Sequence, residues 1–311
     1  MAKNVFLKDK AVADIDAQIS EVLQRLGNPE PPLSLKVVRA ALKLDFGYYS
    51  ASDAGLLQET VAKLRVGAKQ VLLRPSLLID VVRKMDLRAL YIPDQKRILL
   101  DKDQPQLKHR WNEAHEIGHS VIPWHAGAML GDDDHTLIPS CHAALEAEAN
   151  FAAARLLFLQ DRFRNEAVAL EPSFKNLEAL AAKFGNTKAS TFWRCIEHWG
   201  AETPMIGLIT GHPHPAKRLA DFDPAAPCKH FVQSVPFSQQ FANVREGDVF
   251  DQIVEYCGPQ RGGSLGGDDI LLVDDNGDAH VFTFETFCYH HNTLTIGLYK
   301  QPHRVAVAVA A

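Results

Sequence analysis

Three residues near the middle of the chain have the types and the spacing needed to bind a metal ion and activate water. The segment 110–122 reads RWNEAHEIGHSVI, and its centre, His115 to His119, has the pattern H-E-x-x-H. On a helix, residues i and i+4 lie on one face, so the two imidazoles can bind one ion. Glu116 then lies close enough to accept a proton from a bound water molecule. Zinc suits such ligands, because a catalytic zinc site uses three protein ligands and leaves the fourth position to water.

The helix that carries this pattern is expected to be buried behind a cleft. Gly118 costs helix stability relative to alanine, but it allows another backbone to approach closely. Pro123 should end the helix within a turn of His119. The other side chains around the pattern are apolar: Ala114, Ile117, Val121 and Ile122. A buried helix without a metal is the alternative interpretation, and these surroundings favour the metal site.

Two residues compete for the role of third ligand. His125 lies six residues after His119, which is the spacing of the longer pattern H-E-x-x-H-x-x-G-x-x-H. That pattern needs a glycine where this chain has Ile122, and a β-branched residue is a poor substitute where a positive φ is wanted. The other candidate is Glu146, in the predicted helix AALEAEANFAAARLLF, whose alanines allow close packing against the first helix. We favour Glu146 on these steric grounds.

The second helix carries two further polar residues with different expected roles. Asn150 lies four residues after Glu146 on the same face, where it can orient a ligand without binding the metal. Glu148 lies about 200° around the helix from Glu146 and should face elsewhere. The segment 123–142 between the helices is about 20 residues without clear structure, which is typical of a functional rim or lid. One of its histidines (His125, His135 or His142) could stabilise an oxyanion, and we do not choose among them.

Together, the segments HEIGH and EAEANFAAARLLF resemble the ImmA/IrrE family of metallopeptidases, which carry helices of the types HExGH and E-x-E-A-N-x-F-A-A-x-L-L. The resemblance runs from about residue 75 to about residue 200. It implies that His115, His119 and Glu146 bind zinc and that Glu116 is the catalytic base. The chain departs from the family at Ala152, Leu159 and Trp111-Asn112, where Phe, Pro and Phe-Thr are usual. None of these positions is a proposed ligand.

The resemblance implies a zinc-dependent endopeptidase of the gluzincin-like kind, with Zn²⁺ as its cofactor and a protein as its substrate. A helix-turn-helix transcriptional repressor, cut in one exposed loop in phage induction or a stress response, is the substrate that the family suggests. Two other functions stay open: a regulatory module that binds a protein around a structural or inactive zinc site, and a DNA-binding regulator. The segment 174–199 resembles a helix-turn-helix, but its small excess of basic residues argues against direct DNA binding.

Composition and charge limit the remaining classes of function. The chain has 311 residues, a net charge of −5 and 46% hydrophobic residues, so it has an ordinary folded composition and no general attraction for nucleic acid. The sequence contains no run of about 18 apolar residues, so no membrane span is expected, and the N-terminus lacks the apolar core of a signal peptide. The five dispersed cysteines predict reduced thiols and a cytoplasmic location.

The predicted fold class is α+β, in three parts. Residues 1–72 form an N-terminal helical segment, with stripes of helical period over 15–26, 35–42 and 56–64. Residues 73–203 form a mainly helical, zincin-like metallopeptidase domain, with a short helix at 75–85 and a β-hairpin around Pro93-Asp94. The strand that ends at Asp101 could hold an extended substrate by β-augmentation, or only pack against the active helix. Residues 204–311 form a small, mostly β domain for regulation or docking, with a hairpin turn at Asp275-Asn276-Gly277.

Overall fold

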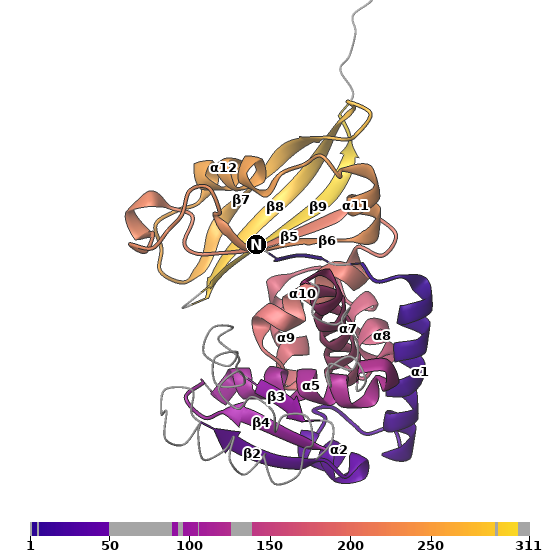
Figure 1. Cartoon of the computed structure of the whole chain (residues 1–311). Helices are drawn as coiled ribbons and strands as arrows, with labels where there is room; N and C mark the ends of the chain where they lie inside the picture. The colour runs from indigo at the N-terminus through magenta and orange to yellow at the C-terminus, as the bar shows by residue number, and fades with distance from the viewer. Residues whose placement is uncertain are drawn as a thin grey trace, which may run out of the picture. The chain divides into compact units, whose positions relative to one another are not determined.

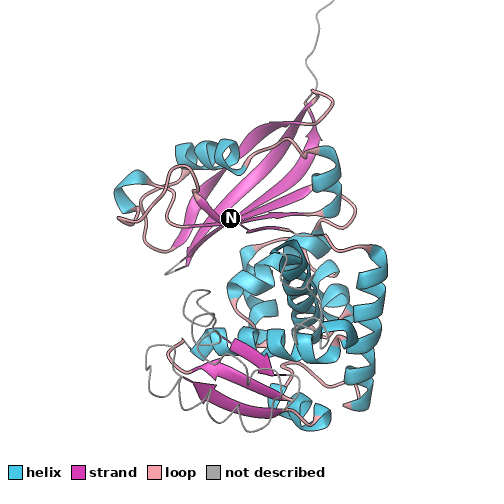
Figure 2. Cartoon of the chain, in the orientation of Figure 1, coloured by secondary structure: helices cyan, strands magenta, loops and turns pink. Residues whose placement is uncertain are grey.

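The computed structural model describes residues 2–4, 6–49, 89–92, 96–104, 106–125, 139–289 and 292–303. They fall into two compact units, which are shown with their helices and strands in Figures 1 and 2. We call Phe6–Phe163 with Lys183–Gly185 the motif unit, because it contains the H-E-x-x-H pattern. We call Met1–Val5, Arg164–Ala182 and Asn186–Ala311 the sheet unit. The fold class is α+β, as predicted.

The motif unit is mainly helical in its described part. Its helices are α1 (Asp9–Arg25), α2 (Leu35–Leu42), α5 (Gln106–Val121) and α7 (Pro139–Leu157), with α8 (Asp161–Val168) beginning at its end. The apolar stripe predicted in the first of these is buried, with Ile15 and Ile19 fully inaccessible. Gly27 follows α1 with a φ of 74°, a left-handed conformation that glycine adopts without steric cost. The helices predicted at 56–64 and 75–85 lie outside the described residues.

A three-stranded sheet packs beside these helices, in the order β2-β4-β3. The strands β3 (Ala89–Ile92) and β4 (Arg97–Asp101) are antiparallel, which confirms the predicted hairpin; its turn at 93–95 lies outside the described residues. The strand β2 (Asp45–Tyr49) pairs with β4 in parallel. The prediction of an entirely helical N-terminal segment is therefore wrong at Asp45–Tyr49, where the aromatic run FGYY favours a strand.

The central position of β4 corrects a second prediction. Both of its edges are paired, one with β2 and one with β3, so the strand that ends at Asp101 cannot offer a free edge to an extended peptide. Among the strands that the structure describes, β3 is the edge strand on this side of the sheet. Of the two described edge strands, β2 and β3, it is β3 that packs against α5.

The sheet unit is built around a six-stranded sheet in the order β1-β6-β5-β9-β8-β7. Its strands are β1 (Ala2–Lys3), β5 (Met205–Thr210), β6 (Cys228–Gln233), β7 (Gly263–Val273), β8 (Ala279–Tyr289) and β9 (Asn292–Pro302). The predicted hairpin joins β7 to β8, with Gly277 at a φ of 90°. The mostly β character of the C-terminal part is confirmed. The parallel pairing of β1 with β6 was not predicted, because it joins residues more than 220 positions apart.

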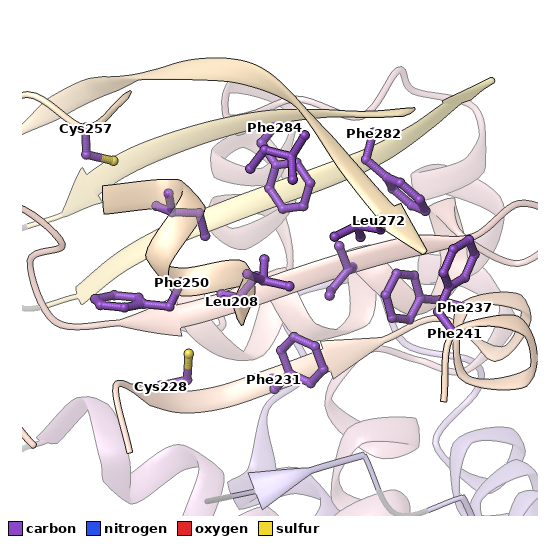
Figure 3. Packing of buried hydrophobic residues seen from close by; sticks show 14 of the residues in the cluster. Leu208, Cys228, Phe231, Phe237, Phe241, Phe250, Cys257, Leu272, Phe282 and Phe284 are labelled. Atoms are coloured by element: carbon purple, nitrogen blue, oxygen red, sulfur yellow. The ribbon is translucent and has the colours of Figure 1, made fainter. Parts of the chain in front are cut away.

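Helices cover both faces of this sheet. On one face, the helices α11 (Val235–Gln240) and α12 (Glu246–Tyr256) cover an aromatic core. This core includes Phe237, Phe241, Phe282 and Phe284 (Figure 3). On the other face, α10 (Lys188–Trp199) packs against β5, with Phe192 and Ile196 buried. Helix α9 (Phe174–Phe184) contributes Phe174 and Leu177 to the same core. The pair of helices that resembles a helix-turn-helix thus uses its apolar side for packing.

The compact units do not follow the three predicted parts. The N-terminal helices share a unit with α5, because Arg39 of α2 forms an ion pair with Glu113 of α5 and β2 extends the sheet beside it. Within the described residues, 6–49 therefore belong to the same unit as α5, and the division into three domains stays a prediction. Among the described residues, no helix combines the length and the apolar composition needed to span a bilayer.

Candidate metal centre

The structure brings the three predicted ligands together on two adjacent helices. His115 and His119 lie one turn apart on α5, with their Nε2 atoms 3.2 Å from each other. Glu146, on α7, places one carboxylate oxygen 3.1 Å from Nε2 of His115 and the other 3.5 Å from Nε2 of His119. These three residues form the only group of histidine, cysteine or carboxylate side chains in the described part of the chain that is arranged to hold a metal ion.

The spacing of these donor atoms fits a single metal ion. Ligand atoms that share a tetrahedral ion at about 2.0–2.1 Å lie about 3.3 Å from one another by simple geometry. The two imidazole nitrogens lie 3.2 Å apart, close to that value, and each has a different oxygen of the Glu146 carboxylate at 3.1 or 3.5 Å. Two imidazole nitrogens and one carboxylate leave a fourth position open, as in a catalytic rather than a structural site. The donor set is therefore suited to a metal, and all three side chains already point toward one position.

Small residues allow the two helices to approach closely enough for this geometry. A Cβ atom added to Gly118 of α5 would lie 2.8 Å from the carbonyl oxygen of Ala149 and 3.2 Å from the Cβ of Ala152, both on α7. Ala149 and Ala152 are fully buried at this contact. The predicted close approach at Gly118 and the predicted second helix are both confirmed. Glu146 reaches the imidazoles because its helix lies directly against theirs.

Asn150 orients the first histidine from the second helix. Its Oδ1 atom lies 3.1 Å from Nδ1 of His115. An amide oxygen can only accept, so Nδ1 of His115 carries a proton and donates to Asn150, which turns Nε2 toward the ligand cluster. This is the role predicted for Asn150 from its spacing to Glu146.

Glu116 is buried beside the cluster and meets the backbone of β3. Its side chain is 5% exposed and accepts a hydrogen bond from the backbone N–H of Tyr91. Burial raises the pKa of Glu116, and the nearby charges of His115 and His119 only partly oppose that rise. A carboxylate with a raised pKa can accept a proton and hold it, as a general base must.

The pKa values of His115 and Glu146 are set by burial and by the contacts between these two side chains and their neighbours. Burial lowers the pKa of His115, but the hydrogen bond to Glu146 and the charges of Glu116 and Glu146 outweigh it, so the net pKa is raised. Burial alone would raise the pKa of Glu146, and its contacts with the imidazoles of His115 and His119 instead hold that pKa far below its usual range. Glu146 is therefore ionised near neutral pH, as a metal ligand must be.

His125, the alternative third ligand, is not part of the ligand cluster. Its Nδ1 atom lies 2.9 Å from Nδ1 of His119, on the side of that ring opposite the cluster, and its Nε2 atom lies 2.9 Å from Oε2 of Glu148. Burial lowers the pKa of His125 to about 4. Glu148 faces away from the cluster, as predicted, and it also accepts a hydrogen bond from Trp124 Nε1 at 2.6 Å.

Sequence reasoning missed this pairing, because His125 and Glu148 lie 23 residues apart and meet only through the fold. Of the other loop histidines, His135 and the side chain of His142 lie outside what the structure describes.

Comparison with known proteins supports the resemblance that the motifs suggested. Residues 76–192 match the family model described as Peptidase_M78, the IrrE N-terminal-like domain, which confirms the resemblance to the ImmA/IrrE family and indicates a metallopeptidase. No curated protein matches the chain. The solved structure of a Mycobacterium tuberculosis transcriptional regulator is similar over 92% of this chain and 88% of that chain, with 14% identity and a TM-score of 0.46. A likeness of that size carries no argument about function.

Proposed function

We propose that the protein is a zinc-dependent endopeptidase with a zincin-like core and a gluzincin-like centre, in which His115, His119 and Glu146 bind zinc and Glu116 is the catalytic base. The observation that carries the proposal is the convergence of two imidazole nitrogens and one carboxylate, with contacts of 3.1–3.5 Å, beside the buried Glu116. The family match over residues 76–192 supports a metallopeptidase.

The residues around the site have separate tasks in peptide hydrolysis. Zinc held by these residues would act as a Lewis acid, lowering the pKa of its bound water and polarising the scissile carbonyl. Glu116 accepts the proton of the attacking water and donates it to the leaving amine. The raised pKa of Glu116 suits a group that must hold this proton between the two steps. Asn150 and His125 contact the Nδ1 atoms of the two histidine ligands and so direct both Nε2 atoms toward one position.

We place the substrate along β3. Tyr91 in this strand directs its backbone N–H at Glu116, so the outer edge of β3 faces the catalytic base. Both edges of β4 are already paired. An extended segment of a protein that added to β3 would pass beside Glu116, and a peptide bond in it would lie within reach of the site. We propose an exposed loop of a helix-turn-helix transcriptional repressor as the natural substrate, on the family resemblance.

Two further features belong to this proposal. The four cysteines whose side chains the structure describes are free thiols, which supports a reducing, cytoplasmic setting: Cys195, Cys228, Cys257 and Cys288. The sheet unit offers a second folded body for regulation or docking. This role would be abandoned if deletion of residues 204–311 changed neither the activity nor its control.

The experiment that tests the function compares the wild type with Glu116→Gln on a peptide library made from a whole proteome. Zinc content is measured in the same samples. The wild type should cut the library and Glu116→Gln should not, while both hold zinc, because the amide cannot accept the proton. Glu202→Gln, a matched change at an exposed position of the sheet unit, should cut like the wild type. Cleavage by Glu116→Gln at the wild-type rate would refute the mechanism. A zinc-loaded wild type that cuts nothing would favour a regulatory protein-binding module instead.

A further inference from the structure

Behind His119, away from the proposed metal position, three side chains form a continuous chain of hydrogen bonds. Oε2 of Glu148 accepts from Nε1 of Trp124 at 2.6 Å and lies 2.9 Å from Nε2 of His125. The other nitrogen of His125 lies 2.9 Å from Nδ1 of His119. His125 is fully buried and His119 is 4% exposed, so little water competes for these bonds. We call Glu148, His125 and Trp124 the histidine relay.

We propose that the histidine relay is a positioning device that fixes the tautomer of His119, so that its Nε2 atom presents a lone pair to the metal. The proposal rests on the proposed metal site, although the relay can be observed in the protein without metal. It gives roles to three residues that are neither ligands nor the catalytic base.

The carboxylate of Glu148, at one end of the relay, determines which nitrogen of each histidine carries the proton. An ionised carboxylate can only accept, so Nε2 of His125 donates to Glu148. A neutral imidazole has one N–H, so Nδ1 of His125 is an acceptor and Nδ1 of His119 must be the donor. His119 then has no proton on Nε2, the atom that lies 3.2 Å from Nε2 of His115 and 3.5 Å from Glu146. The opposite arrangement would put a proton where the metal has to bind.

Trp124 completes the relay by holding the carboxylate. Glu148 is partly exposed, and a single hydrogen bond to His125 would leave its side chain free to rotate into solvent. The second donor, Nε1 of Trp124, binds the same oxygen and restricts that rotation. Trp124 is itself 40% exposed, and the hydrogen bond fixes the direction of the part of its ring that packing leaves uncovered.

The two histidine ligands are therefore oriented in different ways. His115 donates to the neutral amide of Asn150, whereas His119 donates to an imidazole that is backed by a carboxylate. The carboxylate at the far end of the relay accepts a charge-assisted hydrogen bond from His125, whereas the amide behind His115 is neutral.

The test observes the tautomers directly and then measures metal affinity. In the metal-free wild type, long-range ¹H–¹⁵N correlation spectra should show His119 protonated on Nδ1 and His125 on Nε2. Glu148→Leu removes the acceptor, so both tautomers of His119 should be populated, and Zn²⁺ affinity measured against a chromophoric chelator should fall by about 10–100-fold. Glu148→Gln keeps an acceptor oxygen but loses the charge, so the tautomer should be retained and the loss of affinity should be smaller.

The controls separate this role from simple packing and from the proposed function. Glu202→Gln repeats the change at an exposed position and should match the wild type in both readouts. His119 protonated on Nε2 in the wild type would overturn the relay, and so would a Zn²⁺ affinity in Glu148→Leu within twofold of the wild type. A wild type that binds no Zn²⁺ would refute the proposed function instead, while the tautomers would still decide whether the relay exists.

Discussion

Gly118 sets the distance between α5 and α7, so the substitution Gly118→Ala tests whether helix contact controls the metal site. The added Cβ would lie 2.8 Å from the carbonyl oxygen of Ala149 and 3.2 Å from the Cβ of Ala152. The carbonyl belongs to the backbone of a helix and cannot move alone. An ordinary contact is about 3.5 Å, so the carbonyl of Ala149, and α7 with it, has to shift by roughly 0.7 Å.

Opposing effects on stability make the change in metal affinity the more sensitive measure. Alanine in place of a helical glycine gains about 1 kcal/mol, whereas overpacking costs about 1–3 kcal/mol. The net loss of stability should therefore be about 0–2 kcal/mol. A metal site tolerates errors of only about 0.2 Å in ligand distance, and Glu146 lies one turn from Ala149 on the helix that moves. We expect Zn²⁺ affinity to fall at least about tenfold, which is about 1.4 kcal/mol.

The assay is Zn²⁺ competition with a chromophoric chelator, beside thermal unfolding of the metal-free protein. Gly247→Ala is the matched control, because Gly247 lies in helix α12 and a Cβ there would meet nothing within 4 Å. The control should keep wild-type affinity and be equally or slightly more stable. If Gly118→Ala bound Zn²⁺ as tightly as the wild type and were more stable, close helix contact would not position Glu146.

Three further predictions concern the second residue that orients a ligand, the pH dependence of metal binding and the stability of the sheet unit. Asn150→Ala should weaken Zn²⁺ binding by about tenfold in the chelator assay, with little change in thermal unfolding because Asn150 is exposed; wild-type affinity would contradict its orienting role. The pKa of His115 is raised above 6.5 in the metal-free protein, so Zn²⁺ affinity should begin to fall as the pH drops through that raised value; a flat profile from about pH 8 to about pH 6 would contradict this. Desolvation opposes ionisation of Asp274, yet the backbone N–H groups of Asp278 and Asn276 and the side chains of Gln240 and His280 lower its pKa from 3.8 to about 2. Its contribution to stability is present above the ordinary pKa and lost as the pH falls toward about 2. Asp274→Asn should lower the unfolding temperature near neutral pH and have little effect at about pH 2, and equal unfolding temperatures near neutral pH would refute this.

The parts of the site that could be predicted from the sequence are those set by local helical geometry. The spacing of His115 to His119, and that of Glu146 to Asn150, place each pair on one face of a helix whatever the tertiary fold. Gly118 predicted a close approach, because a glycine in a helix otherwise only costs stability. The resemblance of two such helices to one family links Glu146 to the histidines from the sequence alone.

The parts that could not be predicted depend on segments far apart in the chain. The pairing of β2 with β4 joins residues 45–49 to residues 97–101 and makes β4 the central strand, so of the two roles considered for this strand only packing remains. The pairing of His125 with Glu148 likewise depends on how the end of one helix meets the middle of another. No period or turn signal in the sequence specifies such contacts, because tertiary packing decides them.

The central claim is that Glu146 completes a zinc site with His115 and His119, and metal content tests it most directly. Zinc per chain is measured for the wild type and for Glu146→Gln, purified side by side without chelators. Our account predicts about one zinc ion in the wild type and much less in the variant. Full zinc in Glu146→Gln would show that the third ligand is another residue, and no zinc in either protein would contradict the metal centre itself.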